Sequence, residues 1–337
     1  MIRMTSIFRR LFPAMLAALL IGRAGIALAD RPEQCDPEKV LTSDMCVKCH
    51  AAETAVWKST PHFRTFESLH RTPEAKEIAK KMGIASIKRS DVCVQCHYTQ
   101  QQQADGPRAV SGISCESCHG AAKDWLALHN DYGGPGVTRQ LEPVAHREER
   151  LRTSITNGMR NPHNVYLIAR SCLACHTVPH EKLVNVGGHK AGSLDFDLVA
   201  WSQGSLRHRF LESPGANTPA PRERLRVMFL AGLVAELEFS TRATGQATEK
   251  SRYGLTVAQR TAETATKLYD IQKTLQHSLL DEILVAFASA ELRTNNAGQL
   301  DGVADRIRQL GERLADQLDG KQLEFLDQRL PPVNKYK

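Results

Sequence analysis

Residues 46–50 read Cys-Val-Lys-Cys-His, and three more pentads repeat this Cys-x-x-Cys-His pattern. They are Cys-Val-Gln-Cys-His at 93–97, Cys-Glu-Ser-Cys-His at 115–119 and Cys-Leu-Ala-Cys-His at 172–176. Cysteines three positions apart lie on one face of a helical turn, where both thiols can add to the two vinyl groups of one haem. The histidine that follows then faces the iron as proximal ligand. The pentads therefore predict four covalently bound haem c groups.

The pentads also define the predicted site residues. Zinc ribbons and disulfides would explain paired cysteines, but neither requires a histidine directly after every pair. The predicted attachment residues are Cys46, Cys49, Cys93, Cys96, Cys115, Cys118, Cys172 and Cys175. The predicted proximal ligands of the haem iron are His50, His97, His119 and His176.

The amino terminus carries the features of a secretory signal peptide. Arg9 and Arg10 precede an apolar stretch at residues 11–21, and Ala27-Leu28-Ala29 supplies the small residues that a signal peptidase requires. The apolar stretch is too short for a membrane-spanning helix. We therefore expect cleavage near Ala29 and a periplasmic or otherwise exported protein, in agreement with haem attachment outside the cytoplasm.

The charge of the chain excludes a polyanion-binding protein. Residues 1–29 contain four arginines and no acidic residue, so the formal charge of +7 falls to +3 once they are removed. Four haems, each with two propionates and one net positive charge at ferric iron, add roughly −4. The loaded protein is then close to neutral, and neither its charge nor any motif indicates nucleic-acid binding.

Composition divides the chain into four predicted segments: a signal peptide at 1–29, a tetrahaem domain at 30–212, a linker at 213–221 and a helical domain at 222–337. The tetrahaem domain is too small to bury much apolar side chain around four haems, so the haems themselves form most of its core. The predicted fold class is mainly α with long irregular loops, organised around four haems and followed by an α-helical bundle or hairpin.

The helical domain shows apolar stripes at three- and four-residue steps. They predict helices at about 222–240, 256–292 and 298–318, the first apolar almost all round as in a central buried helix. With no pentad and one histidine, His277, this domain should be dispensable for haem content. It is expected to dock on the haem domain, on a second copy of the chain or on a redox partner.

The ninth cysteine, Cys35, lies outside the pentads. A lone thiol in an oxidising compartment can pair between chains, or it can be an incidental residue near a mobile terminus. The sequence leaves both open.

Each haem iron also takes a distal ligand, and histidine is the favoured residue. Nine histidines lie outside the pentads, and all but His277 fall within the predicted tetrahaem domain. Methionines are the rival ligands, with Met45, Met82 and Met159 in the same region. The distal candidates are His62, His129, His208, His189 and His163.

Several stretches resemble the tetrahaem cytochrome c-554 family. The first pentad is followed by Trp57-Lys58-Ser59-Thr60-Pro61-His62, as at that family's opening, and then by Phe66-Glu67-Ser68-Leu69. The third pentad lies in Ser111-Gly112-Ile113-Ser114-Cys115-Glu116-Ser117-Cys118-His119-Gly120, with His129 downstream, and His163 precedes the fourth. The resemblance covers about residues 40–210, and residues 215–337 have no counterpart in it.

The resemblance implies distal ligands for the first and third haems. His129 would complete the first haem, opposite His50. His62 would complete the third haem, opposite His119.

It implies less for the other two haems. A histidine downstream of the fourth pentad would complete the fourth haem, opposite His176; His208 fits the interval, and His189 is the rival. In the family the second haem, here that of His97, is open. Either His163 or His189 could fill that position in this chain.

The function that follows is electron transfer between periplasmic or membrane-bound redox proteins, because iron with two histidine ligands binds no substrate. Family members pass electrons between periplasmic enzymes and quinone- or cytochrome-linked partners. The alternative is an oxidoreductase that reduces a small nitrogen species at an open haem of His97. A third hypothesis is a self-associating haem chain, formed through residues 222–337 or Cys35. An electron carrier is favoured over an enzyme.

Overall fold

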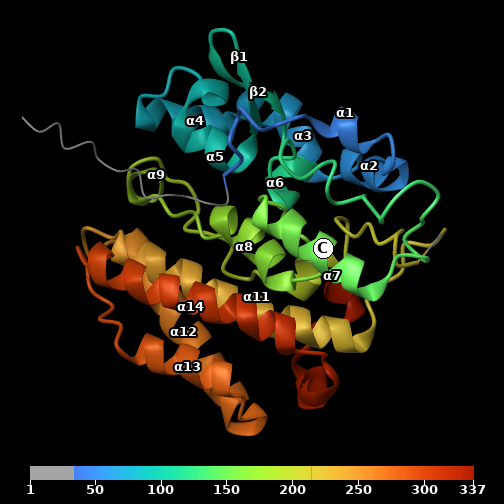
Figure 1. The fold of residues 1–337 in the computed structure, drawn as a ribbon. Coiled ribbons are helices and arrows are strands. Elements are labelled where there is room, and N and C mark those ends of the chain that lie inside the picture. The colour runs from blue at the N-terminus through green and yellow to red at the C-terminus, as the bar shows by residue number, and fades with distance from the viewer. Residues whose placement is uncertain (1–33, 214) are drawn as a thin grey trace, which may run out of the picture. The chain divides into compact units, whose positions relative to one another are not determined.

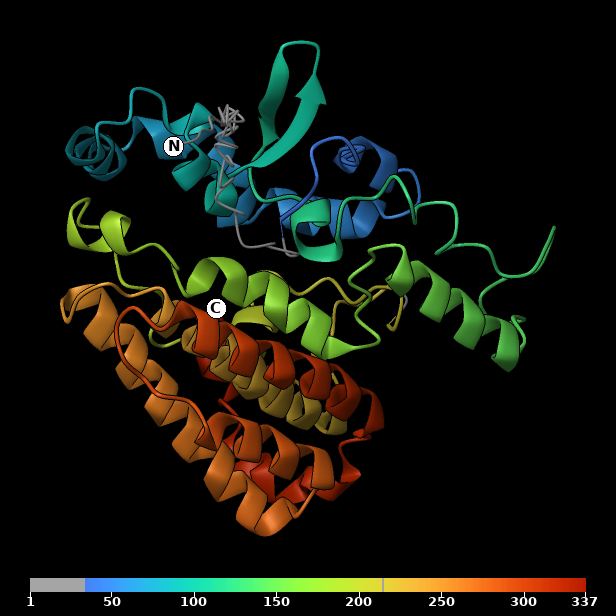
Figure 2. The ribbon, with the colours of Figure 1, turned by 60° about the vertical axis from the view of Figure 1, so that its left-hand side comes forward.

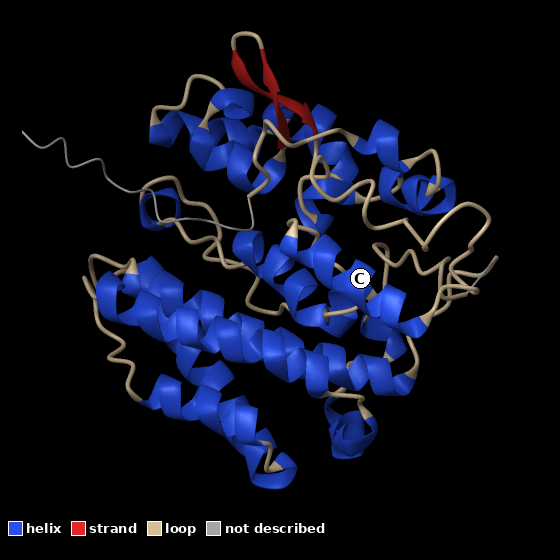
Figure 3. Cartoon of the chain, in the orientation of Figure 1, coloured by secondary structure: helices blue, strands red, loops and turns tan. Residues whose placement is uncertain are grey.

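The computed structural model describes residues 34–213 and 215–337 and is mainly helical (Figures 1 and 3). Within these ranges β-structure is confined to one antiparallel hairpin of β1 (Thr99–Gln103) and β2 (Gly106–Ser111). This confirms the mainly helical fold class expected from the sequence. The predicted signal peptide, residues 1–29, lies outside the described residues.

Short helices and irregular loops make up the chain as far as residue 213. The β1–β2 hairpin lies between α5 and α6. The helices of this region are given below in chain order, and η1 and η2 among them are 3-10 helices. They are α1 (Ser43–Cys46), α2 (Ala51–Lys58), α3 (Pro61–Ser68), η1 (Leu69–Arg71), α4 (Pro73–Met82), η2 (Ile87–Arg89), α5 (Asp91–His97), α6 (Cys115–His119), α7 (Val144–Thr156), α8 (Val165–His176), α9 (Glu181–Asn185) and α10 (Leu198–Ser202).

Local sequence explains where α3 and α4 begin. Each starts at a Thr-Pro pair, in which the threonine hydroxyl accepts a hydrogen bond from the first turn and proline occupies the first helical position. The acceptors are Thr60, bonded by Phe63 N, and Thr72, bonded by Ala75 N. Gly83 ends α4 at a φ of 68°, which glycine adopts without strain.

The carboxy-terminal region consists of longer helices. They are α11 (Arg222–Gly245), α12 (Arg252–Leu275), α13 (Ser278–Ala288) and α14 (Ala297–Gln317), followed by the 3-10 helices η3 (Lys321–Arg329) and η4 (Val333–Lys335). Nearly every residue of α11 from Leu225 onward is buried, as its apolar sequence predicted. Among the described residues, no helix is long and apolar enough to cross a bilayer.

The helix expected at 256–292 is in fact two helices, and this prediction was wrong. Gln276 adopts a left-handed conformation with a φ of 51°, which ends α12. His277 then caps α13, because its ring nitrogen Nδ1 accepts a hydrogen bond from Leu279 N. The apolar stripe continues across the break, so periodicity alone did not reveal it.

Helix α8 joins the two regions of the chain. It lies between the short helices and the carboxy-terminal helices in Figures 1 and 2 and packs on α11. Its residues Tyr166, Ala169 and Leu173 are fully buried in the same hydrophobic core as α11 to α14. The core therefore extends across the linker predicted at 213–221.

A buried charge cluster reinforces this packing. Glu238 of α11 accepts hydrogen bonds from the Tyr166 hydroxyl at 2.7 Å and from Arg170 Nε at 2.9 Å. Arg242 contacts the same carboxylate at 3.3 Å. Since a buried carboxylate is costly unless it is paired and hydrogen-bonded, these contacts fix the position of α8 on α11.

Candidate haem-binding sites

The four pentads occupy helical turns, as their spacing requires. The second pentad lies in α5, the third forms α6 and the fourth ends α8. The first pentad begins at the last residue of α1, and its turn is closed by the hydrogen bond from His50 N to Cys46 O at 2.9 Å. We number the sites by their pentads: first at 46–50, second at 93–97, third at 115–119 and fourth at 172–176.

Each pentad histidine faces one further histidine ring. Ring centres lie 6.2–6.4 Å apart in all four cases. The pairs are His50 with His129 at 6.4 Å, His97 with His189 at 6.3 Å, His119 with His208 at 6.2 Å, and His176 with His62 at 6.3 Å.

This separation fits a metal ion held between two imidazoles. Each metal–nitrogen bond is about 2 Å long and each nitrogen lies about 1.2 Å from its ring centre, so two axial imidazoles have centres about 6 Å apart. Rings in direct stacking contact would lie closer. The four histidine pairs therefore match the axial ligand set of haem iron.

Hydrogen bonds orient several of these rings. The Nδ1 atoms of His119, His129, His189 and His208 lie 2.6–3.3 Å from backbone carbonyl oxygens. A carbonyl only accepts, so Nδ1 must carry the proton and donate it. The unprotonated Nε2 is then the nitrogen available to iron, as in other histidine-ligated metal sites.

The protonation state of the pentad histidines also fits metal binding. Burial, which disfavours the imidazolium, lowers the pKa of His97, His119 and His176 to about 4 in each case. The second histidine of each pair lowers these pKa values further. The rings are therefore neutral at neutral pH, the state that binds a metal.

The observed pairing of the rings differs in part from the ligand scheme that the family resemblance implied. His129 lies opposite His50, as expected. His62, expected opposite His119, instead faces His176. A hydrogen bond from Ile113 N to the carbonyl of His62, at 3.1 Å, fixes the start of α3 beside the chain that leads into the third pentad.

Of the remaining candidates, His208 lies at another site than expected, whereas His189 lies at the second site, one of the two positions left open for it. His208, expected at the fourth site, lies opposite His119 at the third. His189 lies opposite His97. His163 is exposed, its carbonyl accepts a hydrogen bond from Arg224, and none of the described ring contacts joins it to a pentad histidine.

Cysteines of different pentads lie beside each other, and these contacts show which sites are neighbours. The Cys46 and Cys115 thiols lie beside each other, and this contact lowers the pKa of Cys115. Cys175 hydrogen-bonds Cys96, and this contact and burial raise its pKa.

The third and fourth pentads adjoin as well. The pKa of Cys172 is raised to about 12, chiefly by burial and then by the nearby Cys118. Ser171 Oγ donates to the Cys118 carbonyl at 2.9 Å. The sites thus adjoin in the order first, third, fourth and second, with the first and second sites at the two ends.

Glu116, inside the third pentad, has a structural role that the Cys-x-x-Cys-His pattern does not indicate. Its buried carboxylate accepts hydrogen bonds from the backbone N–H groups of Leu41, Thr42 and Ala122 at 2.8–2.9 Å. Burial is the main effect on its pKa and raises it. Glu116 thereby fixes the segment before the first pentad against the third.

The carboxy-terminal helices reach the fourth site through Arg260 of α12. Its Nη1 donates to the His176 carbonyl at 3.3 Å, and its Nε donates to Glu236 at 2.8 Å. His176 also packs against Phe196 and Trp201, whose ring centres lie 5.4 and 4.9 Å away. Nothing in the sequence distinguished Arg260 from the other arginines of the helical region.

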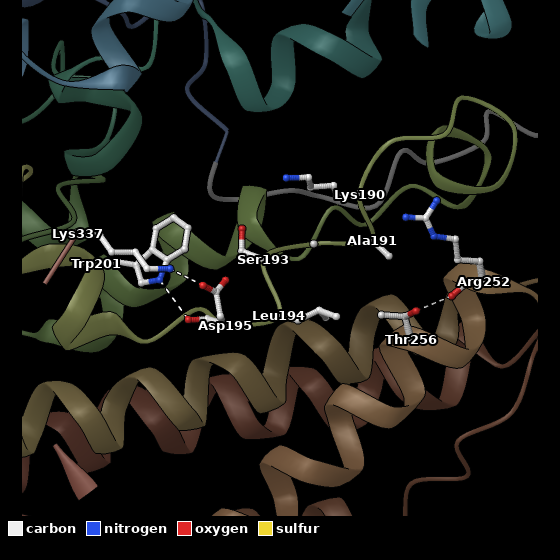
Figure 4. Close-up of a pocket in the computed structure, with 10 residues that line it drawn as sticks. Lys190, Ala191, Ser193, Leu194, Asp195, Trp201, Arg252, Thr256 and Lys337 are labelled. Atoms are coloured by element: carbon white, nitrogen blue, oxygen red, sulfur yellow. Dashed lines mark hydrogen bonds and ion pairs between the residues drawn. The ribbon is translucent and has the colours of Figure 1, made fainter. Parts of the chain in front are cut away.

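A cavity of ≈ 590 Å³ lies beside the fourth site (Figure 4). Its lining includes Ser193, which contacts Nδ1 of the proximal histidine at 3.0 Å, and Trp201. Lys190, Arg252 and Lys337 supply its basic groups, and Lys337 Nζ lies 4.4 Å from the centre of the Trp201 ring system. The cavity therefore borders the Nδ1 side of the ring, away from the nitrogen available to iron.

Residues 45–120 match the family model described as cytochrome c554 and c-prime. This segment belongs to that family. The match contains the first three pentads, whereas the fourth lies beyond it. It confirms the family resemblance found in the sequence and implies c-type haem as the cofactor.

Two curated relatives agree with the family match. Cytochrome c-554 of Nitrosomonas europaea is 33% identical over 96 residues, which cover 26% of this chain and 41% of that protein. The C-type polyheme cytochrome OmcB of Geobacter sulfurreducens is 29% identical over 125 residues, 32% of this chain and 16% of OmcB. The chain thus spans less than half the length of either relative. No solved structure matches it.

The second site departs from what the cytochrome c554 resemblance implied. An open haem requires that no side chain faces His97 across the iron position. Here His189 faces it, and its Nδ1 lies 2.8 Å from the Lys190 carbonyl oxygen. Gly187 and Gly188 precede His189, and Gly188 has a φ of 80°, so this turn uses a conformation that favours glycine.

Proposed function

We propose that this chain is an exported tetrahaem c-type cytochrome that carries electrons between redox partners. Four haem c groups would be held by the four pentads, each with one proximal and one distal histidine. The distal residues would be His129, His189, His208 and His62 for the first to fourth sites. Haem iron between two imidazoles supplies one-electron transfer without a change of ligand.

The observation that carries this proposal is the four-fold recurrence of one geometry. Every pentad histidine has a partner ring at 6.2–6.4 Å, and the four partners come from widely separated parts of the chain. A single pair at that spacing could be a packing coincidence. Four pairs, one for each pentad, support the same role for all of them, which is to bind haem iron.

The residues of the chain would hold the cofactors rather than act on a substrate. The thiols would anchor each group covalently, each ring pair would hold its iron, and the hydrogen bonds to Nδ1 would keep the rings in place. Because the four sites adjoin in one order, their arrangement suits a carrier that accepts an electron at one end and releases it at the other. Reduction of a small nitrogen species would need an open axial position, and the His97–His189 pair counts against one at the second site.

We also propose export and periplasmic or membrane-bound redox partners. The leader features and the extracytoplasmic chemistry of haem attachment support export. Self-association through residues 222–337 remains a prediction.

Two measurements test the function. Mass spectrometry of the mature protein should find four haem adducts per chain, and fewer would refute the central proposal. Electron paramagnetic resonance of the oxidised protein should give low-spin iron only, whereas a high-spin signal from one haem in four would favour the reductase.

A matched pair of variants assigns the second site. His189→Ala should convert one haem in four to high spin, because it removes one axial ligand. His163→Ala, a change of the same kind at an exposed histidine, should leave the spectrum unchanged. Unaltered spectra in both variants would show that the second site uses another ligand.

A further inference from the structure

The second site forms one end of the row of sites, and three basic side chains lie there or at the cavity beside the adjoining fourth site. Lys81 at the end of α4, Lys190 beside His189, and Arg252 at the start of α12 come from different parts of the chain, and all three are exposed. Below we call Lys81, Lys190 and Arg252 the basic face.

Contacts place Lys81 and Lys190 at the second site, and the cavity beside the adjoining fourth site is shared by Lys190 and Arg252. Lys81 Nζ lies 3.8 Å from the position that a Cβ on Gly188 would occupy, directly before His189. Lys190 follows His189 in the chain, and its carbonyl oxygen contacts that ring. Lys190 and Arg252 both line the cavity of ≈ 590 Å³, on the loop and on α12 respectively (Figure 4).

Most of this positive charge is not neutralised. Lys81 lies 3.7 Å from Glu77, with both side chains about half exposed, so that pair is weak. Among the described residues no ion pair involves Lys190 or Arg252. The acidic side chain that lines the cavity, Asp195, is ion-paired with Lys337.

The opposite end of the row differs in charge. Residues 36–53, which lead into and follow the first pentad, contain four acidic and two basic residues. Glu53 lies 3.8 Å from Nδ1 of His50. Residues 71–91, which precede and enter the second pentad, contain six basic and three acidic residues. The segments that carry the first and second pentads therefore differ in the sign of their charge.

We propose that the basic face is the docking surface for an acidic redox protein, which exchanges electrons with this chain at the second site. This inference rests on the proposed function and adds the end of the row and the charge of the partner. A carboxylate side chain of the partner enters the cavity between Lys190 and Arg252. Complementary charge brings the two redox centres together and raises the rate of encounter.

The test uses the full haem-loaded protein and reduced plant-type [2Fe–2S] ferredoxin as an acidic one-electron donor. Each encounter oxidises the ferredoxin by one electron and reduces the cytochrome by one, with no proton transferred. At low ionic strength the charge-reversal variant Lys190→Glu/Arg252→Glu should lower the second-order rate constant about tenfold. The neutral variant Lys190→Gln/Arg252→Gln should lower it less, and added salt should reduce both differences.

The matched control is Lys58→Glu/Lys123→Glu, which makes the same change in net charge near the first site but outside the pentads, where both lysines are exposed. It should leave the rate close to that of the unaltered protein. An equal loss in the control would overturn the proposal, because net charge alone would then explain the effect. So would an unchanged rate in the charge-reversal variant.

A membrane surface is the alternative binding partner of the basic face, and a vesicle experiment distinguishes it from an acidic protein. If the basic face instead binds anionic phospholipid vesicles, charge reversal will abolish sedimentation with vesicles and leave the ferredoxin rate unchanged, which also overturns the proposal. The haem spectrum and reduction by dithionite are measured first on each variant. A protein without reducible haem would refute the proposed function itself, independently of where a partner docks.

Discussion

Residues 34–164 and residues 222–337 are similar in length but differ in what holds them together. The first region buries six apolar side chains, whereas the second buries thirty-two. In the first, the side chains that converge are cysteines and histidines; in the second they are leucine, isoleucine and valine. The contrast indicates that the first region depends on its cofactors for a core, while the second supplies its own.

Helix α8 belongs to both regions. One end carries the fourth pentad, and the buried residues Tyr166, Ala169 and Leu173 complete the core of the carboxy-terminal helices. The helical region is thus attached to the fourth site by packing, by the Glu238 cluster and by Arg260. It has a structural connection to the cofactor region although it carries no pentad.

The largest expected effect is that of withholding haem. Protein made without haem attachment should lose protection from hydrogen exchange throughout residues 34–164, because six buried apolar side chains cannot offset the conformational entropy of that length. Helices α11 and α14 should stay protected. Hydrogen-exchange mass spectrometry measures both regions in one sample, and equal protection would break the comparison.

The next effect is that of removing residues 222–337. From the sequence they were expected to be dispensable for haem content. The structure adds that the fourth site should be disturbed, since truncation exposes the apolar face of α8 and removes the Arg260 bond to His176. A chain ending at Leu211 should lose the low-spin signal of one haem in four. Retention of four low-spin haems would show that α8 holds its position without the bundle.

A smaller effect is expected from Glu238→Gln, which removes the charge that links α8 to α11. Taking one partner from a buried ion pair costs about 3–5 kcal/mol of unfolding free energy. The control Glu282→Gln alters an ion pair with Arg306 in which both side chains are about half exposed, and should cost about 0–1 kcal/mol. Urea titration followed by circular dichroism compares the two. A similar loss in both would mean that the cluster does not bind α8 to the bundle.

The comparison also shows what a sequence can predict. The pentads predict their own ligands, because three-residue spacing is a local property of a helical turn. The distal candidates could be recognised because histidines are numerous in residues 34–212, but their pairing could not. His62 and His176 are far apart in the sequence, and tertiary packing alone brings them together.

The same limit applies to the helical region. The apolar sequence of α11 correctly predicted a buried helix, since burial on all sides leaves a compositional signal. The break at Gln276 left none, because the apolar stripe continues through it. Arg260 likewise looks like any helical arginine until the fold places it against His176.

The smallest expected effect concerns the hydrogen bond between His176 and Ser193. Nε2 is the nitrogen available to iron, so Nδ1 carries the proton and donates it to Ser193 Oγ at 3.0 Å. Such a bond makes the imidazole more electron-rich and favours ferric iron. Ser193→Ala should therefore raise the reduction potential of one haem in four and change the unfolding free energy by about 1 kcal/mol or less. Ser205→Ala, at an exposed serine, is the control. Spectroelectrochemical titration measures the reduction potentials of the four haems. A rise in one potential alone assigns that potential to the fourth site. A uniform shift of all four potentials, or a fall, would show that Ser193 does not accept a hydrogen bond from His176.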